Sequence, residues 1–289
     1  MITSRLRYMV LRFSTALYIL LIFQSCSHGP GIDRPITGYE RFMDLNEYEL
    51  TFRDEFDGET LNEDIWFTDP YWRPNHPQQH IINDERQAYI RDAIELQDGV
   101  LRIKIQKQHA PYAGQVMDYT SGLISTWNGG FGQKYGYFEI RCRLPATKGL
   151  WPAFWLFPRK DNKFGSPGSE IDVFEYWPHE NRDEFAVNIH WDGYEEYHRS
   201  DLHRVKSRNL TNEFNVYGVE ITPNEVVFFF NGKEIAHHSG PGVSHDHMHL
   251  IANCAVVSRG AKDSLLPDYF EIDYIRVYQR KKPFVDLHY

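Results

Sequence analysis

Residues 225 to 237 read E-V-V-F-F-F-N-G-K-E-I-A-H, and this stretch carries the strongest hairpin signal in the chain. Valine, isoleucine and phenylalanine are residues that pack well in strands. Asn231-Gly232 stands between two such runs, and both residue types accept the positive φ angles that a tight two-residue turn requires. The stretch therefore predicts a hairpin, two antiparallel strands joined at Asn231-Gly232.

Similar strand-like runs recur along the chain, and turn residues such as Asp98-Gly99 and Asn128-Gly129-Gly130 separate them, with almost no helical periodicity. The expected strands are 49–54, 93–96, 100–106, 122–126, 136–144, 153–157, 169–176, 185–191, 215–221, 225–230, 233–237, 249–256 and 269–278. Many short strands without helical crossovers predict antiparallel sheets packed as a sandwich or jelly roll.

Residues 169 to 177, S-E-I-D-V-F-E-Y-W, place three acids within one of these apolar runs. Because side chains alternate between the two faces of a strand, Glu170 and Asp172 share one face, and Glu175 would fall on the opposite, core-facing side. An unpaired carboxylate in the core is costly. One extra residue in a β-bulge around Val173-Phe174 would bring Glu175 back to the face of the other two.

A row of three carboxyls suits retaining glycoside hydrolysis, in which one carboxyl is the nucleophile and another is the acid/base. The like charge between them keeps the acid protonated near neutral pH. The alternative is an exposed edge strand whose charges prevent aggregation. The local sequence leaves both interpretations open.

The composition favours strands and a carbohydrate partner. Aromatic residues make up 15% of the 289 residues, and aromatic rings are both strand formers and stacking platforms for sugar rings. The net charge of -9 argues against nucleic acid as a partner, because nucleic-acid binding needs a basic surface. A neutral polysaccharide is compatible with this charge.

Residues 1–26 are expected to be a signal peptide. Three arginines precede an apolar stretch from 13 to 23, which is too short for a comfortable membrane span. Cys26 stands where bacterial lipoproteins carry their lipidated cysteine, so we expect a lipid anchor and export to the cell surface or the periplasmic face of a membrane. Plain secretion and an uncleaved anchor are the alternatives. Residues 27–46, rich in Gly and Pro, are expected to be a flexible tether.

Two further cysteines, Cys142 and Cys254, lie in apolar runs. We expect both to be buried thiols. A disulfide between them is the alternative in an exported protein.

Several sequence blocks together resemble glycoside hydrolase family 16. They are F-R-D-E-F-D-G, D-G-V-L-R-I, Y-G-Y-F-E-I-R, G-L-W-P-A-F-W-L, N-I-H-W and E-I-D-Y-I-R-V-Y, which follow the family's order from about residue 50 to 279, and E-I-D-V-F-E matches the family's bulged Glu-x-Asp-x-x-Glu signature. The resemblance implies a concanavalin-like β-jelly roll, an all-β sandwich of two antiparallel sheets with an open cleft. We place this domain at residues 47–281 and a C-terminal tail at 282–289.

The same resemblance implies a role for each acid. Glu170 corresponds to the nucleophile, Asp172 to the central acid that holds and tunes it, and Glu175 to the acid/base. No cofactor is expected for catalysis, because this chemistry needs only one ionised and one protonated carboxyl on the same side of the bond.

The residues expected to bind the polysaccharide are Trp151, Trp155, Trp177, His190, Trp127 and Asn128. Trp151 and Trp155 are four residues apart and share one strand face, as do Glu175 and Trp177. In the family, the corresponding tryptophans line the cleft, and His190 resembles a histidine near the acid/base. A place in the core is the alternative for Trp151, Trp155 and His190. Trp127 precedes a Gly-Gly turn that could border the cleft.

Two groups of residues are candidates for metal binding. The histidines of H-D-H-M-H, residues 245 to 249, alternate along one strand face with a spacing that could suit a transition metal, although the segment also matches the start of a family strand. The resemblance implies a structural calcium ion on the convex face. Its ligands would be the Asp273 side chain and the backbone oxygens of Glu55 and Gly99.

The sequence therefore predicts a monomeric, retaining endo-hydrolase of a β-linked polysaccharide. A β-1,3- or mixed β-1,3-1,4-glucan leads, because N-D-E-R-Q-A-Y-I resembles a stretch common in laminarinases. A red-algal galactan, cleaved by an agarase or porphyranase, is the alternative, and the basic and aromatic cluster at 71–80 could read a different, even sulfated, sugar. A transglycosylase and a non-hydrolytic glycan-binding lipoprotein also stay open.

Overall fold

The hairpin at residues 225 to 237 forms as predicted. β14 (Glu225–Phe230) and β15 (Lys233–Ser239) are antiparallel neighbours. Asn231 and Gly232 between them have φ angles of 49° and 79°, and two positive values are typical of a type I′ turn. This description rests on a computed structural model that covers residues 40–70, 81–127, 130–158, 170–178, 181–194 and 196–284.

Short strands make up most of this part of the chain. The other strands are β1 (Tyr48–Asp54), β2 (Gln87–Tyr89), β3 (Ile94–Gln97), β4 (Val100–Tyr112), β5 (Gln115–Ser121), β6 (Leu123–Ser125), β7 (Gly136–Arg143), β8 (Leu150–Pro158), β9 (Glu170–Glu175), β10 (Glu184–Trp191), β11 (Arg199–Ser200), β12 (His203–Lys206), β13 (Asn215–Ile221), β16 (Met248–Val256) and β17 (Asp268–Arg280). Short 3₁₀ helices occur at η1 (Leu45–Glu47), η3 (Arg91–Ala93) and η4 (Asp263–Leu265).

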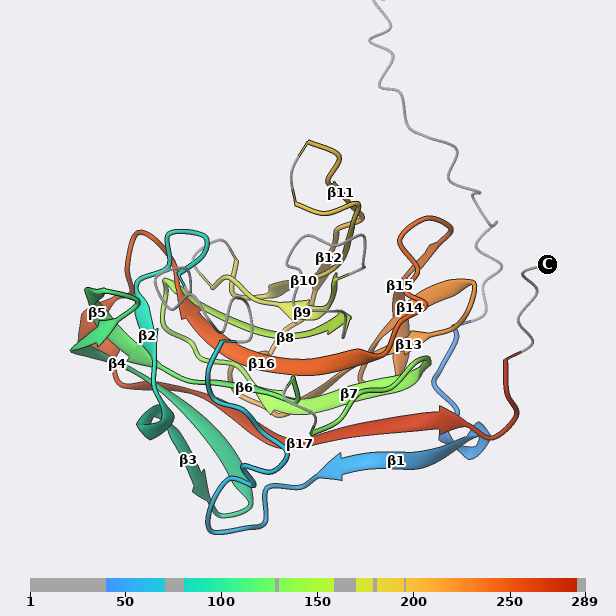
Figure 1. Ribbon diagram of the computed structural model, residues 1–289, viewed down its shortest axis with the longest axis horizontal. Helices are drawn as coiled ribbons and strands as arrows, with labels where there is room; N and C mark the ends of the chain where they lie inside the picture. The colour runs from blue at the N-terminus through green and yellow to red at the C-terminus, as the bar shows by residue number, and fades with distance from the viewer. Residues whose placement is uncertain are drawn as a thin grey trace, which may run out of the picture. The chain divides into compact units, whose positions relative to one another are not determined.

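The strands form two sheets. The larger has the order β15-β14-β13-β7-β17-β4-β5-β2, with β1 beside β17 and β3 beside β4. The smaller has the order β11-β10-β9-β8-β16-β6, with β12 beside β10. Figure 1 shows β8, β9 and β16 side by side above β7 and β17. The predicted all-β jelly-roll sandwich is confirmed, except that β2 and β5 pair in parallel.

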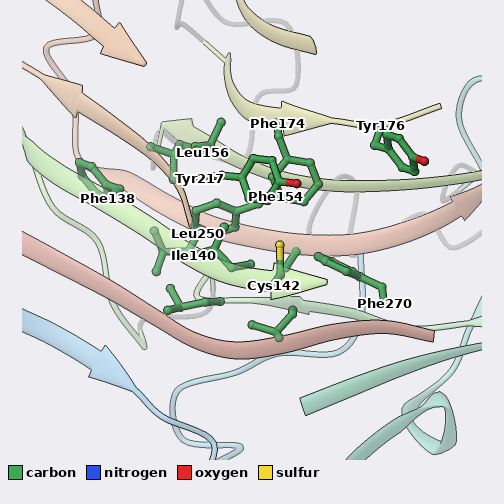
Figure 2. Packing of buried hydrophobic residues seen from close by; sticks show 14 of the residues in the cluster. Phe138, Ile140, Cys142, Phe154, Leu156, Phe174, Tyr176, Tyr217, Leu250 and Phe270 are labelled. Atoms are coloured by element: carbon green, nitrogen blue, oxygen red, sulfur yellow. The ribbon is translucent and has the colours of Figure 1, made fainter. Parts of the chain in front are cut away.

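The core lies between the two sheets, where inward-facing side chains of both meet (Figure 2). Phe174 of β9 packs against Tyr217 of β13, with ring centroids 4.4 Å apart and the ring planes tilted by 40°. Burial of each such side chain contributes about 1.5–3 kcal/mol. Cys142 and Cys254 are buried and free, which confirms the prediction of two thiols. This packing fixes the inner face of β9 and leaves its other face for the site.

Part of the predicted tether is not free. Residues 40–46 run along the outer edge of β15, where the Met43 amide donates to the Gly232 carbonyl at 2.8 Å and the Glu234 amide donates to the Arg41 carbonyl at 2.9 Å. An edge strand offers unpaired backbone groups, and a neighbouring segment can satisfy them. The expected flexible segment therefore ends before residue 40 rather than at 46.

The expected signal peptide, Cys26 and the remaining tether lie outside the described residues. None of the helices in the described ranges has the length and apolar character needed to span a bilayer.

Candidate active site

A β-bulge sets the direction of the three acids on β9. Two adjacent residues of β8 face the three residues from Asp172 to Phe174, so that Val173 is the extra residue. The register against β10 shifts in the same region. Val173 and Phe174 both point into the core, where they are 1% and 0% exposed. Glu175 therefore returns to the face of Asp172, as the sequence predicts.

The three carboxyls line one cavity of about 350 Å³ on the face of the smaller sheet that points away from the core. Asp172 is 3% exposed and lies in the middle of the row, while Glu170 and Glu175 are partly exposed. The other lining residues are Ile82, Asn83, Trp151, Ala153, Trp155, Tyr194 and Asn253. A concave site with aromatic walls and a few converging polar groups is typical of ligand binding.

The two outer carboxyls have different hydrogen-bond donors. The Tyr194 hydroxyl donates to Glu170 Oε2. Trp151 Nε1 donates to Glu175 Oε1 at 3.0 Å. Each donor holds its carboxyl in one orientation, and both donors belong to the cavity wall.

The central acid faces a histidine pair. His190 Nε2 lies 3.2 Å from Asp172 Oδ2, and His190 Nδ1 lies 2.8 Å from His198 Nε2, with the two rings stacked. Within the described ranges, Glu170, Asp172 and His190 each place one carboxylate oxygen or ring nitrogen within 4.8 Å of those of the other two. This closeness follows from the sheet, because Glu170 and His190 are register partners on β9 and β10.

Burial raises the pKa of the carboxyls, but not equally. For Glu170, burial and then the charge of Asp172 raise the pKa to about 8, while His190 and the Tyr194 hydrogen bond oppose the rise. For Glu175, burial and then the charges of Asp172 and Glu170 raise the pKa well above its usual range. Two neighbouring carboxyls, Asp172 and Glu170, oppose the ionisation of Glu175, whereas Asp172 alone opposes that of Glu170. This difference favours a protonated Glu175 as the acid/base and an ionised Glu170 as the nucleophile.

Two tryptophans of β8 form the aromatic wall, as their spacing predicts. Trp151 and Trp155 both line the cavity. Trp155 Nε1 donates to Asn253 Oδ1 at 2.8 Å, and Asn253 Nδ2 donates to the Tyr89 hydroxyl at 2.9 Å. Trp155 is thus both a core residue, at 9% exposed, and a cavity residue held in a fixed orientation.

The sequence model of the glycosyl hydrolases family 16 matches residues 80–248, a range that contains β9, its bulge and the three acids. The chain belongs to this family.

Relatives of this family 16 chain include a beta-glycanase and a beta-glucanase. Endo-1,3-1,4-beta-glycanase ExsH of Rhizobium meliloti (strain 1021) is 30% identical over 253 residues, covering 82% of this chain and 53% of that protein. A beta-glucanase of Rhodothermus marinus is 30% identical over 292 residues, covering 91% of this chain and 93% of that protein. Against ExsH and EglC, the chain spans about half of the relative's length.

A solved structure shares the fold. The laminarinase catalytic domain from Thermotoga maritima MSB8 superposes with a TM-score of 0.73 at 25% identity, covering 82% of this chain and 100% of that chain.

The remaining predicted sugar-binding residues of the family 16 domain lie beside the cavity or outside the described residues. Trp177 lies against Trp151, with ring centroids 5.6 Å apart, and extends the aromatic surface beyond the cavity. Trp127 packs edge-on against His249 at 4.8 Å, among core residues. His190 contacts Asp172 rather than lining the cavity. Asn128 lies outside the described residues.

Sequence reasoning missed five of the residues that line the cavity, and two of them, Tyr194 and Asn253, hold other cavity residues by hydrogen bonds. Tyr194 sits in the loop after β10, and no periodicity connects a loop residue to an acid on another strand. Asn253 could have been predicted from the sequence, because it is the single amide side chain in the apolar run of β16. A polar side chain in a buried strand needs a hydrogen-bond partner.

The described residues do not bring the histidines of H-D-H-M-H to one metal site. His249 is buried between Trp127 and Phe157, whereas His245 Nδ1 lies 2.7 Å from the Tyr135 hydroxyl. The strand begins only at Met248, so the three histidines do not share one strand face.

The residues predicted to hold calcium have other partners. Asp273 is the extra residue of a bulge in β17, and its carboxylate is paired with Arg141. The Glu55 carboxylate is held by Arg276 through bonds of 2.8 and 2.9 Å. Gly99, with a φ of 73°, forms the turn between β3 and β4. A hard cation would have to displace a guanidinium from Asp273, so the Asp273 carboxylate does not fit the predicted site, whereas the backbone oxygens of Glu55 and Gly99 stay predicted ligands.

Proposed function

We propose that this protein is a retaining endo-glycanase that hydrolyses a β-1,3- or mixed β-1,3-1,4-linked glucan. The observation that carries the proposal is the bulge of β9, which turns Glu170, Asp172 and Glu175 into one cavity. The names of the Rhodothermus marinus beta-glucanase and the Thermotoga maritima laminarinase support a β-glucan as the substrate class.

In the proposed mechanism, the Glu170 carboxylate attacks the anomeric carbon while Glu175 donates its proton to the leaving oxygen. A glycosyl ester forms on Glu170. Glu175, now ionised, takes a proton from water, and the resulting hydroxide attacks the anomeric carbon and releases Glu170. Enzymes of the family need no catalytic cofactor.

The neighbours of the acids support this division of roles. Asp172 stands between the two carboxyls and keeps Glu175 protonated through its negative charge. The Tyr194 hydroxyl favours the ionised form of Glu170. The tryptophans of β8 offer apolar faces for successive sugar rings.

The test is release of reducing ends from laminarin, mixed-linkage glucan, agarose, porphyran and κ-carrageenan by the wild-type chain, Glu170→Gln and Glu175→Gln. We expect cleavage of the glucans and loss of cleavage in Glu170→Gln with an unchanged circular dichroism spectrum. Wild-type turnover by Glu170→Gln would refute the nucleophile role, and cleavage of a galactan alone would overturn the substrate. Binding of a polymer without new reducing ends would show a glycan-binding protein instead.

We further propose that the domain acts as a monomer on the outside of the cell, held by a lipid at Cys26. Only the sequence pattern before Cys26 supports the anchor. Cys26→Ala should move the protein from the membrane fraction to the soluble fraction, and a membrane-bound variant would contradict the proposal.

We also propose that Arg141, rather than calcium, neutralises Asp273. Addition of EDTA should then leave the melting temperature unchanged. A fall in melting temperature that calcium restores would reinstate the predicted ion.

A further inference from the structure

A second hollow, of about 270 Å³, lies where the loop between β7 and β8 meets the loop after β16. Three cations line it, Lys148, Arg259 and Lys262. Each is exposed, and none has an ion-pair partner in the part of the chain that the structure describes. Three unpaired positive charges around one hollow stand out in a chain of net charge -9.

Backbone contacts hold the two loops together. The Val257 amide donates to the Gly149 carbonyl at 3.0 Å, and the Lys262 amide donates to the Lys148 carbonyl at 2.9 Å. The loops also approach so closely at Gly149 that a Cβ added there would lie 2.2 Å from the Gly260 carbonyl oxygen. The cations therefore project from a fixed framework rather than from a free loop.

The acids and the other cations around the hollow are already paired. Asp263 accepts a hydrogen bond from the Tyr119 hydroxyl at 2.7 Å and lies 3.3 Å from Lys107. Arg86, whose side chain reaches the backbone of Ser258, is paired with Asp118. Within the described ranges no acid forms an ion pair with the three cations, although Asp268 accepts from the backbone amides of Ala146 and Thr147 nearby. A bound anion would relieve the repulsion among the cations.

The hollow adjoins the candidate active site. Gly149 precedes Trp151 by two residues, and Val257 follows Ala255, the register partner of Trp151, by two residues. Two extended residues span at most about 7 Å, so the backbone of the hollow begins within about 7 Å of the tryptophan that donates to Glu175. A polysaccharide bound in the cavity would carry its substituents within reach of the cations.

We propose that this hollow is a subsite for an anionic substituent, a sulfate ester or a carboxylate, on the polysaccharide that occupies the cavity. The inference rests on the proposed function, because the cavity must bind the glycan chain itself. Arg259 offers the planar fork that suits either anion, and the two lysines add point charges.

The test compares binding of laminarin, sulfated laminarin and carboxymethyl laminarin to the full chain carrying Glu170→Gln, by isothermal titration calorimetry. The hollow variant adds Lys148→Gln, Arg259→Gln and Lys262→Gln. A matched control adds Arg53→Gln, Arg208→Gln and Lys282→Gln, which remove the same charge from exposed sites elsewhere in the described chain. Inorganic sulfate serves as the probe for a free anion.

We expect the hollow variant to bind the two anionic polymers about tenfold more weakly than the control variant does, at equal affinity for laminarin. The difference should shrink at 0.5 M NaCl, because salt screens exposed charges. Equal weakening in the control variant would show a bulk charge effect and overturn the proposal, as would tight binding of sulfate alone. Failure of the wild-type chain to cleave laminarin would refute the glucanase but leave the anion preference measurable.

Discussion

Tyr194→Phe should move the acid limb of the pH–activity profile to higher pH. The Tyr194 hydroxyl donates to Glu170, and a donor favours the ionised carboxylate and lowers its pKa. Removal of the hydroxyl therefore raises the pKa of Glu170. Because the nucleophile must be ionised, the variant needs a higher pH to reach the same activity.

The size of the effect follows from the strength of the bond. A hydrogen bond to a charged group contributes about 1.5–3 kcal/mol, and one pH unit corresponds to about 1.36 kcal/mol. The pKa should therefore rise by about one to two pH units, and on the acid limb kcat/KM should fall by about 10- to 100-fold. At pH values above the new pKa, the activity should approach that of the wild type.

The assay measures kcat/KM for laminarin from pH 4 to 10, since this parameter reports the pKa values of the free enzyme. Tyr197→Phe is the control, because Tyr197 lies in the same loop but is 73% exposed. A Tyr194→Phe profile that is lowered uniformly, with its acid limb in place, would refute the role of the hydroxyl in the ionisation of Glu170.

Two further predictions concern residues behind the cavity. Asn253→Ala should raise KM for laminarin and lower stability by about 1–3 kcal/mol, because Trp155 and Tyr89 each lose a buried partner; unchanged KM and melting temperature would contradict this. Glu85→Gln should stabilise the protein at pH 8 but not at pH 4. Burial raises the pKa of Glu85 from 4.5 to about 7, so the folded state keeps a proton that the unfolded state loses, and wild-type stability falls by about 3 kcal/mol as pH rises through this window. Urea titrations at the two pH values measure the difference, and equal stabilisation at both would exclude the titration of Glu85.

The sequence predicted those parts of the fold for which the residue types allow only one local conformation. Asn231-Gly232 favours a tight turn between two strands. Glu175 is three residues after Asp172 and would face the core in a regular strand, so a bulge is needed to bring it to the face of Asp172. β2 and β11 were missed because strands of two or three residues have no readable period. β5 and β12 were missed because their polar residues obscure the alternation.

The sequence predicted the three acids of the candidate site, but not all of the residues that surround them. Glu170, Asp172 and Glu175 lie on one strand, so a sequence motif can describe them together. Tyr194 and Asn253 reach the cavity from a loop and from another strand, and only the register of the smaller sheet brings them there. The contact of residues 40–46 with β15 was not predicted, because the sequence does not show that β15 is the edge strand of its sheet.

The contact of residues 40–46 with β15 also has a mechanical meaning. If a membrane anchor upstream pulls on the chain, the bonds of Glu40, Arg41 and Met43 to the β14–β15 hairpin are the first contacts of the described domain to bear the load. That hairpin is the far edge of the larger sheet, whereas the acids lie on β9 of the smaller one. Tension on the tether would thus be taken up in a different sheet from the one that holds the acids, which leaves their spacing undisturbed while the protein works on a large polymer.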